Sequence, residues 1–318
     1  MRQLRSLAFL SGCAILASCG SDGGNTAPPA TGGGGNTPTP APAPTYQTFA
    51  ELSGTQTFVT TCAGADSSGN FYDGAAALGE GVKIVSDRSE PSYTVSNGTA
   101  DRFAFSTTFT QADRKPGGGE SYEKPKPNGH SENFSIYVLK ENGVELEYVR
   151  FAQLAVDSDI GQSFRDCVLG VPTLATDIPD ATVDYDGLYY IGTASVRNPE
   201  SPSGFSYYDI DASVGTMRAN PATGEIDFTL NLIGRPYSSS GSTTRVDFGT
   251  FTGTTTFDGT EQGFTGFPVN ADNQEVGLFG GGFFGPQGAT AALSLAIRDY
   301  RPDGSDLYAT AVLILRPQ

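Results

Sequence analysis

Apolar and polar residues alternate along much of the chain after residue 185, with a period of two. The clearest case is the segment 225–232, Glu-Ile-Asp-Phe-Thr-Leu-Asn-Leu, in which every second residue is apolar. Because successive side chains of a strand point to opposite faces, this pattern predicts strands with one buried face. Turn sequences rich in Gly, Pro and Asn separate such segments, and long helical periodicity is missing. The chain is therefore predicted to be all-β.

The second half of the chain, residues 176–318, is expected to hold about eight strands. They are predicted near residues 185–196, 205–216, 224–233, 243–251, 253–258, 261–268, 277–284 and 289–298, with 307–315 as a candidate ninth. An up-and-down barrel of eight strands closes its own edges and fills its interior with side chains. We therefore expect an eight-stranded antiparallel up-and-down β-barrel over residues 176–318.

The beginning of the chain has the features of a secretory signal. Arg2 and Arg5 precede a short apolar run, which ends in Leu-Ala-Ser-Cys at residues 16–19. The run is too short to span a bilayer, which takes about 20 apolar residues. The Leu-Ala-Ser-Cys sequence resembles the lipobox of bacterial lipoproteins, which implies that residues 1–18 are a signal peptide and that Cys19 is acylated. The alternative is an ordinary secretory signal in which Cys19 is incidental.

Residues 19–45 are expected to form a lipidated, disordered tether. They are almost entirely Gly, Pro, Thr, Ala, Ser and Asn, with Asp22 as the only charge, so they cannot form an apolar face. In lipoproteins with a similar signal, a glycine after the acylated cysteine implies sorting to the outer membrane. The expected location is therefore the outer membrane, with the folded body facing the outside of the cell.

Residues 46–175 are expected to form a separate β-rich domain. Strands are predicted near 102–109, 134–140 and 144–151, and a polar stretch rich in Lys, Pro and Gly runs from 114 to 130. Cys62 and Cys167 both lie in this half, and in an oxidising compartment such a pair usually forms a disulfide. Two free thiols are the alternative. A bridge confined to this half supports a domain boundary near residue 175.

Charge and motifs exclude several classes of function. The formal net charge of −16 argues against nucleic acid or an anionic membrane surface as the partner. His130 is the only histidine and lies in a Lys/Pro/Gly stretch, so neither a catalytic base nor a metal site is expected. Acid pairs at 157–159, 184–186 and 209–211 lack a complete calcium loop, and in strands they are typical of a solvated face. No cofactor is expected, and a hydrolase remains a remote alternative.

Tyrosines and a basic stretch are the candidate partner contacts. Six tyrosines lie near expected barrel turns: Tyr185, Tyr189, Tyr190, Tyr207, Tyr208 and Tyr237. Tyrosine is favoured at interfaces because a flat side chain combines a large contact area with a hydroxyl. We select Tyr189, Tyr207, Tyr208 and Tyr237 as candidate partner contacts. The basic stretch 114–126 is a second candidate, although ordinary packing and a solvated loop would also explain these two patterns.

The second half also resembles a known family, the β-barrel domain of lipoproteins related to transferrin-binding protein B. The resemblance rests on four stretches: 170–187, 246–253 (Val-Asp-Phe-Gly-Thr-Phe-Thr-Gly), 263–266 (Gly-Phe-Thr-Gly) and 277–289, a glycine-aromatic strand that ends in Gly-Pro. A Glu followed by Gly, usual in the family shortly after that Gly-Pro, is replaced here by Ala-Thr-Ala-Ala-Leu at 289–293. True transferrin-binding proteins of this family have two handle-and-barrel lobes, whereas this chain has room for one.

The resemblance implies a handle domain (46–175) before the barrel and a binding function without catalysis. The partner would be an extracellular protein or a small solute; related families bind a host metal carrier, a haem source or a complement regulator. A periplasmic lipoprotein with a structural role at the envelope is the alternative. An open bore would favour a carrier of small solutes, and a filled bore would favour surface recognition by loops.

Overall fold

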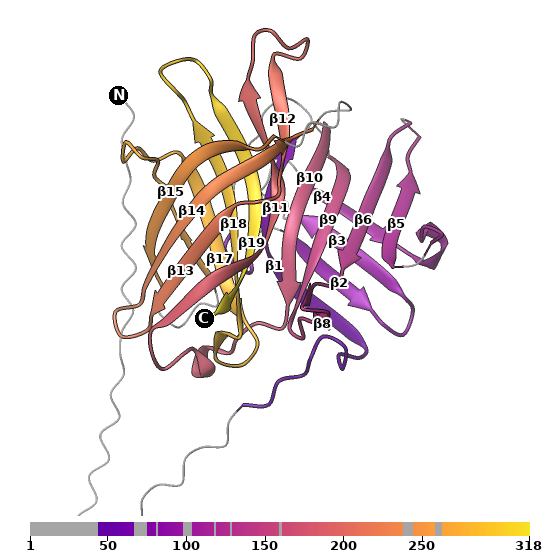
Figure 1. The fold of residues 1–318 in the computed structure, drawn as a ribbon. Helices are drawn as coiled ribbons and strands as arrows, with labels where there is room; N and C mark the ends of the chain where they lie inside the picture. The colour runs from indigo at the N-terminus through magenta and orange to yellow at the C-terminus, as the bar shows by residue number, and fades with distance from the viewer. Residues whose placement is uncertain are drawn as a thin grey trace, which may run out of the picture. The chain divides into compact units, whose positions relative to one another are not determined.

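The computed structural model describes residues 44–66, 75–80, 82–97, 104–117, 119–127, 129–158, 161–237, 244–257 and 263–318. The expected signal peptide, Cys19 and all but the end of the tether lie outside these residues. The described chain is all-β and forms two large antiparallel sheets, with 3-10 turns η1 (Gln111–Asp113), η2 (Ala175–Asp177) and η3 (Pro286–Gly288) (Figure 1). The predicted fold class is confirmed.

The handle sheet has eight strands in the order β4-β3-β2-β1-β10-β9-β6-β5. Their bounds are β1 Thr55–Asp66, β2 Lys83–Asp87, β3 Ser92–Asn97, β4 Phe105–Phe109, β5 Glu120–Pro125, β6 Ser131–Tyr137, β9 Val149–Ser158 and β10 Gly161–Gly170. A small hairpin, β7 Lys140–Glu141 and β8 Val144–Glu145, stands beside it. The sheet curls so that its two edge strands approach each other, and Lys124 on β5 donates to the Thr108 carbonyl on β4 at 3.1 Å. Stacked rings of Phe109, Tyr122 and Phe134 fill the inside of the curl.

Cys62 and Cys167 form a disulfide inside the handle sheet. They lie directly opposite each other on the neighbouring antiparallel strands β1 and β10, with Cα atoms 4.1 Å apart. Both side chains are buried in the handle core. The pairing expected from the cysteine count is confirmed, and it crosslinks the two central strands of the sheet.

The barrel is formed by eight strands arranged in chain order, in which the last strand pairs with the first and only β15 and β16 share no ladder within the described residues. Their bounds are β11 Val183–Arg197, β13 Val214–Asn220, β14 Glu225–Pro236, β15 Val246–Thr256, β16 Gly263–Gly266, β17 Gly277–Phe284, β18 Thr290–Asp299 and β19 Leu307–Pro317. An extra strand, β12 Phe205–Ile210, pairs with both β11 and β14 at one end. The barrel is nearly closed: the Thr255 hydroxyl of β15 donates to the Thr265 carbonyl of β16, and an isolated bridge joins Thr252 of β15 to Val269, which follows β16.

Three strand predictions were wrong in detail. The segment 205–216 is two strands, β12 and β13, because the chain leaves the barrel wall and returns at Ser213, whose hydroxyl accepts from the Ile233 amide at 2.9 Å. The segments 243–251 and 253–258 form one strand, β15. Gly253 does not end it, since this glycine makes room for the Phe228 ring, which would lie 2.3 Å from an added Cβ. The candidate ninth strand, in contrast, is confirmed: β19 closes the barrel against β11.

The barrel bore is filled by side chains. Large, fully buried side chains come from strands all round the wall, among them Tyr185, Met217, Leu230, Phe251 and Phe279. The Phe228 and Phe279 rings meet edge to face with centroids 4.7 Å apart. Within the described residues, the interior is therefore a packed core and not a ligand channel.

The handle sheet packs against the outside of β17, β18 and β19. Buried apolar residues of both sheets meet there, including Phe151 and Val168 of the handle and Val312 of the barrel. The buried Thr61 hydroxyl bonds the Ser294 hydroxyl at 2.9 Å across this contact. Gly280 of β17 lies against the backbone of Ala76, so no side chain fits between them. Residues 44–318 thus form one compact unit.

Candidate functional site

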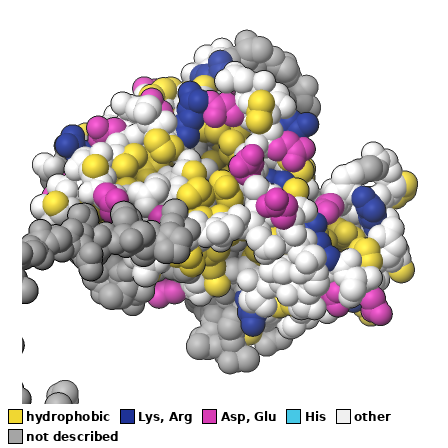
Figure 2. Space-filling model, turned by 90° about the horizontal axis from the view of Figure 1, so that it is seen from below, with side chains coloured by type: hydrophobic (Ala, Val, Ile, Leu, Met, Phe, Trp, Pro, Cys, Tyr) yellow, Lys and Arg dark blue, Asp and Glu magenta, His cyan; other side chains and the backbone are white. Residues whose placement is uncertain are grey.

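The barrel has two different ends. At one end lie η2, η3 and the first described residues: the Tyr46 hydroxyl accepts the Leu174 amide at 2.9 Å. Seen from below, this face shows apolar side chains in its middle, with acidic and basic side chains interspersed (Figure 2). The opposite end carries β12 and the loops that follow β11, β16 and β18. We call this opposite end the distal rim.

Two of the four selected tyrosines are exposed at the distal rim and lie together. Tyr207 on β12 is 43% exposed and Tyr237, just after β14, is 75% exposed. The Tyr237 amide donates to the Tyr207 carbonyl at 2.7 Å, which holds the two backbones side by side.

The other tyrosines serve packing contacts. Lys140 donates its amide to the Tyr189 hydroxyl at 3.1 Å, and this hydroxyl donates back to the Lys140 carbonyl, so Tyr189 joins the barrel to the small β7–β8 hairpin. The Tyr208 ring meets Phe248 edge to face at 5.0 Å. Tyr185, grouped with the exposed tyrosines in the sequence, is instead fully buried, and its hydroxyl donates to the Gly288 carbonyl at 3.0 Å.

Tyr207 belongs to a larger aromatic strip on the outer face of the barrel. The Phe205 ring lies 6.5 Å from Tyr207 and 5.8 Å from Tyr308, and Tyr300 lies 6.4 Å from Tyr308. The Arg298 guanidinium stacks over Tyr300 at 4.5 Å. We define Phe205, Tyr207, Arg298, Tyr300 and Tyr308 as the aromatic strip. Apart from Tyr207, the sequence analysis missed them, because β12, β18 and β19 bring them together from distant segments.

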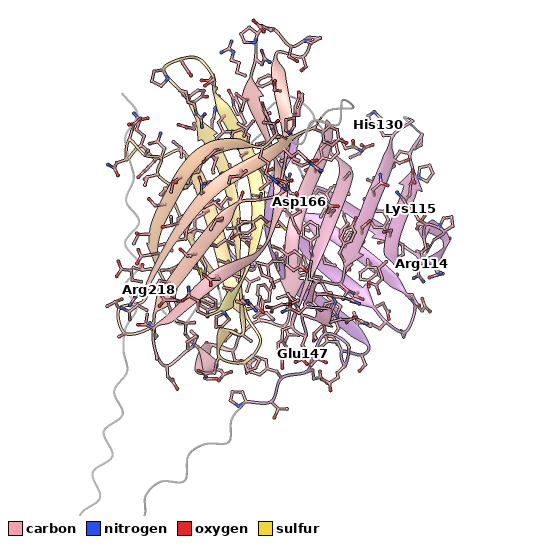
Figure 3. All side chains as sticks on the ribbon, in the orientation of Figure 1. Arg114, Lys115, His130, Glu147, Asp166 and Arg218 are labelled. Carbon is pink, nitrogen blue, oxygen red and sulfur yellow. A yellow bond between two sulfur atoms is a disulfide. The ribbon has the colours of Figure 1, made fainter. Side chains whose placement is uncertain are left out.

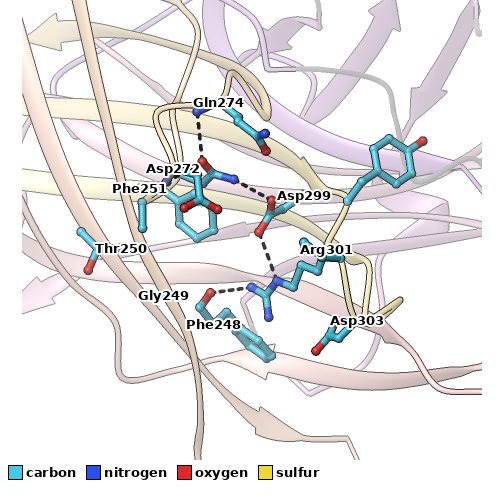
Figure 4. A pocket seen from close by; sticks show the side chains of 13 residues that line it. Phe248, Gly249, Thr250, Phe251, Asp272, Gln274, Asp299, Arg301 and Asp303 are labelled. Atoms are coloured by element: carbon cyan, nitrogen blue, oxygen red, sulfur yellow. Dashed lines mark hydrogen bonds and ion pairs between the residues drawn. The ribbon is translucent and has the colours of Figure 1, made fainter.

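A groove of about 590 Å³ opens beside the strip at the distal rim. Its walls come from β15 (248–251), the β16–β17 loop (270–274) and the end of β18 with the following turn (299–303) (Figure 4). Tyr300 lies in both the groove lining and the aromatic strip. No motif in the sequence pointed to this site, because its three walls meet only when the barrel forms.

Hydrogen bonds join the three walls of the groove. Asn270 accepts the amide of Gln274 at 3.0 Å and donates its side-chain amide to Asp299 at 2.9 Å. Asp299 also accepts from Arg301 at 3.1 Å, and Arg301 donates to the Phe248 carbonyl at 2.6 Å. This chain of bonds, drawn in Figure 4, holds the groove open and neutralises the buried carboxylate of Asp299.

Two further carboxylates remain at the groove. Asp272 and Asp303 lie on opposite walls, and neither forms an ion pair within the described part of the chain. Hydrogen bonds from the Ser305 hydroxyl and amide hold the pKa of Asp303 below its usual value. The groove therefore carries net negative charge at neutral pH, since the charge of Arg301 is matched by Asp299.

The basic stretch of the handle is largely neutralised. Residues 120–125 are strand β5 and not a loop, which corrects the sequence analysis. Lys126 pairs with the buried Glu132 at 2.9 Å, and Lys115 pairs with Glu123 at 3.3 Å. His130 lies 3.4 Å from Asp157 on the part of the handle farthest from the barrel (Figure 3). Among the described residues of this stretch, Lys115 and Lys126 are thus matched by carboxylates, whereas Arg114 and Lys124 donate to backbone carbonyls.

The acid pairs do not assemble a site. Asp184 pairs with Arg218 at 3.8 Å, and Asp209 and Asp211 pair with Arg235 at 3.7 and 3.8 Å. Among the described residues, no group of His, Cys, Asp or Glu is arranged to hold a metal ion. None of the helices in the described part of the chain has the length and apolar character needed to cross a membrane.

Comparison with known proteins returns structures but no sequence relatives. No protein-family model matches the chain, and no curated protein matches it. A transferrin binding protein B mutant from Haemophilus parasuis Hp5 aligns with 18% identity and a TM-score of 0.42, over 82% of this chain and 45% of that one. Isotype 1 transferrin binding protein B from serogroup B Neisseria meningitidis aligns with 13% identity and a TM-score of 0.34, over 84% and 77%.

The chain spans less than half the length of the Haemophilus parasuis protein. The structures returned belong to the family that the sequence motifs resemble.

Proposed function

We propose that this chain is a lipid-anchored outer-membrane protein that faces outward and binds a protein partner through its distal rim. The anchor is supported by the lipobox-like Leu-Ala-Ser-Cys and by the Gly/Pro-rich composition of residues 20–45. The resemblance of the barrel motifs implies a host protein, such as a metal carrier, as the class of partner.

The proposal rests mainly on one observation: the barrel bore is packed, whereas the distal rim exposes aromatic side chains. The bore is packed with buried aromatic and aliphatic side chains, which favours surface recognition over transport of a small solute inside the barrel. The distal rim instead exposes Tyr207, Tyr237 and Tyr300, next to an open groove. Exposed tyrosines and a stacked arginine are typical anchors of protein interfaces.

The orientation of the body also supports this surface. The first described residues lie at the end of the barrel that is opposite the distal rim. An anchor that precedes them would leave the rim farthest from the attachment point. The proposal is a binding module and not an enzyme, because Asp184 and Asp209 are used in surface ion pairs and His130 lies in the turn between β5 and β6 of the handle.

The test is capture of a partner from native growth medium by the detergent-solubilised full chain, followed by affinity measurement with the identified protein. We expect Tyr207→Ser with Tyr237→Ser to weaken binding at least about 10-fold, because interface tyrosines bury large areas. Tyr137→Ser is the matched control, since Tyr137 is 42% exposed but lies on the handle. Equal affinity of the double variant and the wild type would disprove binding through these two tyrosines.

A further inference from the structure

The groove at the distal rim lies where the barrel wall is open. On the side away from β14, Thr252 of β15 exchanges two backbone hydrogen bonds with Val269, at 3.0 and 2.7 Å. Within the described part of the chain, the ladder on this side of β15 stops there. Among the described residues, the part of β15 before Thr252 therefore has a backbone neighbour, β14, on one side only.

The direction of the free backbone groups follows from the strand geometry. In a strand, alternate residues direct their N–H and C=O groups to the same side. Thr250 continues the regular register of β15, opposite Asn231 of β14, so its N–H and C=O point the same way as those of Thr252. They face the groove, whose wall includes Thr250.

The chain turns away from this edge at Asn270. The Asn270 side chain accepts the amides of Asp272 and Gln274, both at 3.0 Å, and Asn273 adopts a left-handed conformation with φ 58°. This turn prevents residues 271–273 from continuing the ladder along β15. Arg301 lies on the third wall of the groove, residues 299–303. It donates to the Phe248 carbonyl and so holds the edge of β15 in place.

We infer that the groove takes an extended polypeptide segment carrying a lysine or arginine, which adds as a strand to the free edge of β15. Main-chain bonds to Thr250 would supply the pairing, as in other cases of strand addition. Asp272 and Asp303, one on each opposite wall, match a basic side chain in charge. The inference rests on the proposed function, because the segment would belong to the protein partner.

The probe is the peptide acetyl-Thr-Val-Lys-Val-Thr-Val-Thr-amide, titrated into the full chain by NMR, with amide hydrogen exchange read at Thr250. We expect binding to protect the Thr250 amide. We expect the same peptide with Glu for Lys to bind at least 10-fold more weakly, and the peptide N-methylated at alternate residues not to bind. No change at Thr250 at millimolar peptide, or equal binding of the N-methylated peptide, would overturn the inference.

Charge variants separate strand addition at this groove from general attraction to an acidic protein. We expect Asp272→Asn with Asp303→Asn to lower the affinity for the lysine peptide about 10-fold, which is about 1.4 kcal/mol. Asp180→Asn with Glu80→Gln removes the same charge from exposed positions elsewhere and should leave the affinity unchanged. An equal loss in both double variants contradicts the inference.

The captured partner distinguishes this inference from the proposed function. If the Asp272/Asp303 double variant binds the partner normally while the Tyr207/Tyr237 variant does not, the groove inference fails and the proposed function stands. If the peptide binds as expected but the tyrosine variant keeps full affinity for the partner, the groove stands and the tyrosine surface does not.

Discussion

At the scale of single residues, Asp166 is the carboxylate most affected by its surroundings. It lies on β10, on the same face as Val168, which packs against the barrel, and Figure 3 places it between the two sheets. Its side chain accepts a hydrogen bond from Gln153 at 2.9 Å. Burial raises the pKa of Asp166 to about 6 and outweighs this bond. The folded protein therefore holds a proton on Asp166 at pH values where the unfolded chain has lost it.

We predict that Asp166 makes the protein less stable as the pH rises from about 4 to about 6. Between these values the folded state binds more protons than the unfolded state, so the free energy of unfolding falls with pH and then levels off. Asp166→Asn keeps an acceptor for Gln153 and should remove this slope, with a gain of about 2 kcal/mol at pH 7.5. Urea unfolding at pH 4, 5, 6 and 7.5 measures both the pH dependence of the free energy of unfolding and the gain in stability of the variant. Identical pH profiles of variant and wild type would contradict the assignment.

At the scale of elements, strand β17 shows why a glycine-aromatic sequence is needed at the handle contact. A Cβ on Gly280 would lie 2.4 Å from the backbone of Ala76, and the Leu78 amide donates to the Gly281 carbonyl at 3.1 Å. The segment 75–80 thus lies directly on the outer face of the strand. Phe279 and Phe283 meanwhile point into the barrel core.

Replacing Gly280 tests this close approach. Gly280→Ala should destabilise the protein by about 3 kcal/mol, because backbone atoms must move to admit the methyl group. Gly215→Ala is the matched control in strand β13, where an added Cβ comes nearest to the end of the Leu313 side chain, at 3.2 Å. We expect the control to change stability by less than about 1 kcal/mol. The comparison is made by denaturant unfolding, and similar losses in the two variants would refute the explanation.

At the scale of the whole molecule, the start of the folded body is fixed at the end opposite the groove. Phe49 stacks on Phe58 at 5.1 Å and lies beneath the guanidinium groups of Arg150, at 4.5 Å, and Arg88, at 5.1 Å. Arg150 is buried and donates to the Val149 carbonyl at 2.8 Å. These contacts hold the segment that follows the expected tether, so an anchor would act on a defined point of the body.

The anchor itself is tested by labelling with an alkyne fatty acid. We expect the wild type and Cys13→Ser to incorporate the label, because Cys13 lies within the expected signal peptide. Cys19→Ser should lose the label, because the acylated thiol is gone. Mass spectrometry of the mature amino terminus provides a second measurement. A labelled Cys19→Ser variant would rule out the lipoprotein assignment.

The class of fold could be predicted from the sequence, because strand alternation is a local property and cysteines can be counted. Ile226, Phe228, Leu230 and Leu232 alternate as expected, and all four side chains are buried in the barrel core. The paired cysteines and the packed, glycine-rich β17 were also expected from composition. The alternation and the cysteine count can be read without knowing which strands become neighbours.

The sequence did not predict where the strands meet or which side chains share a surface, because both depend on how the whole barrel closes. Alternation continues through residues 205–216, so the sequence gives no sign that β12 leaves the wall to pair with β11 and β14. The aromatic strip joins Phe205 to Tyr308, and the groove joins Phe248 to Arg301. Such contacts link residues that are far apart in the chain, and barrel closure alone brings them together.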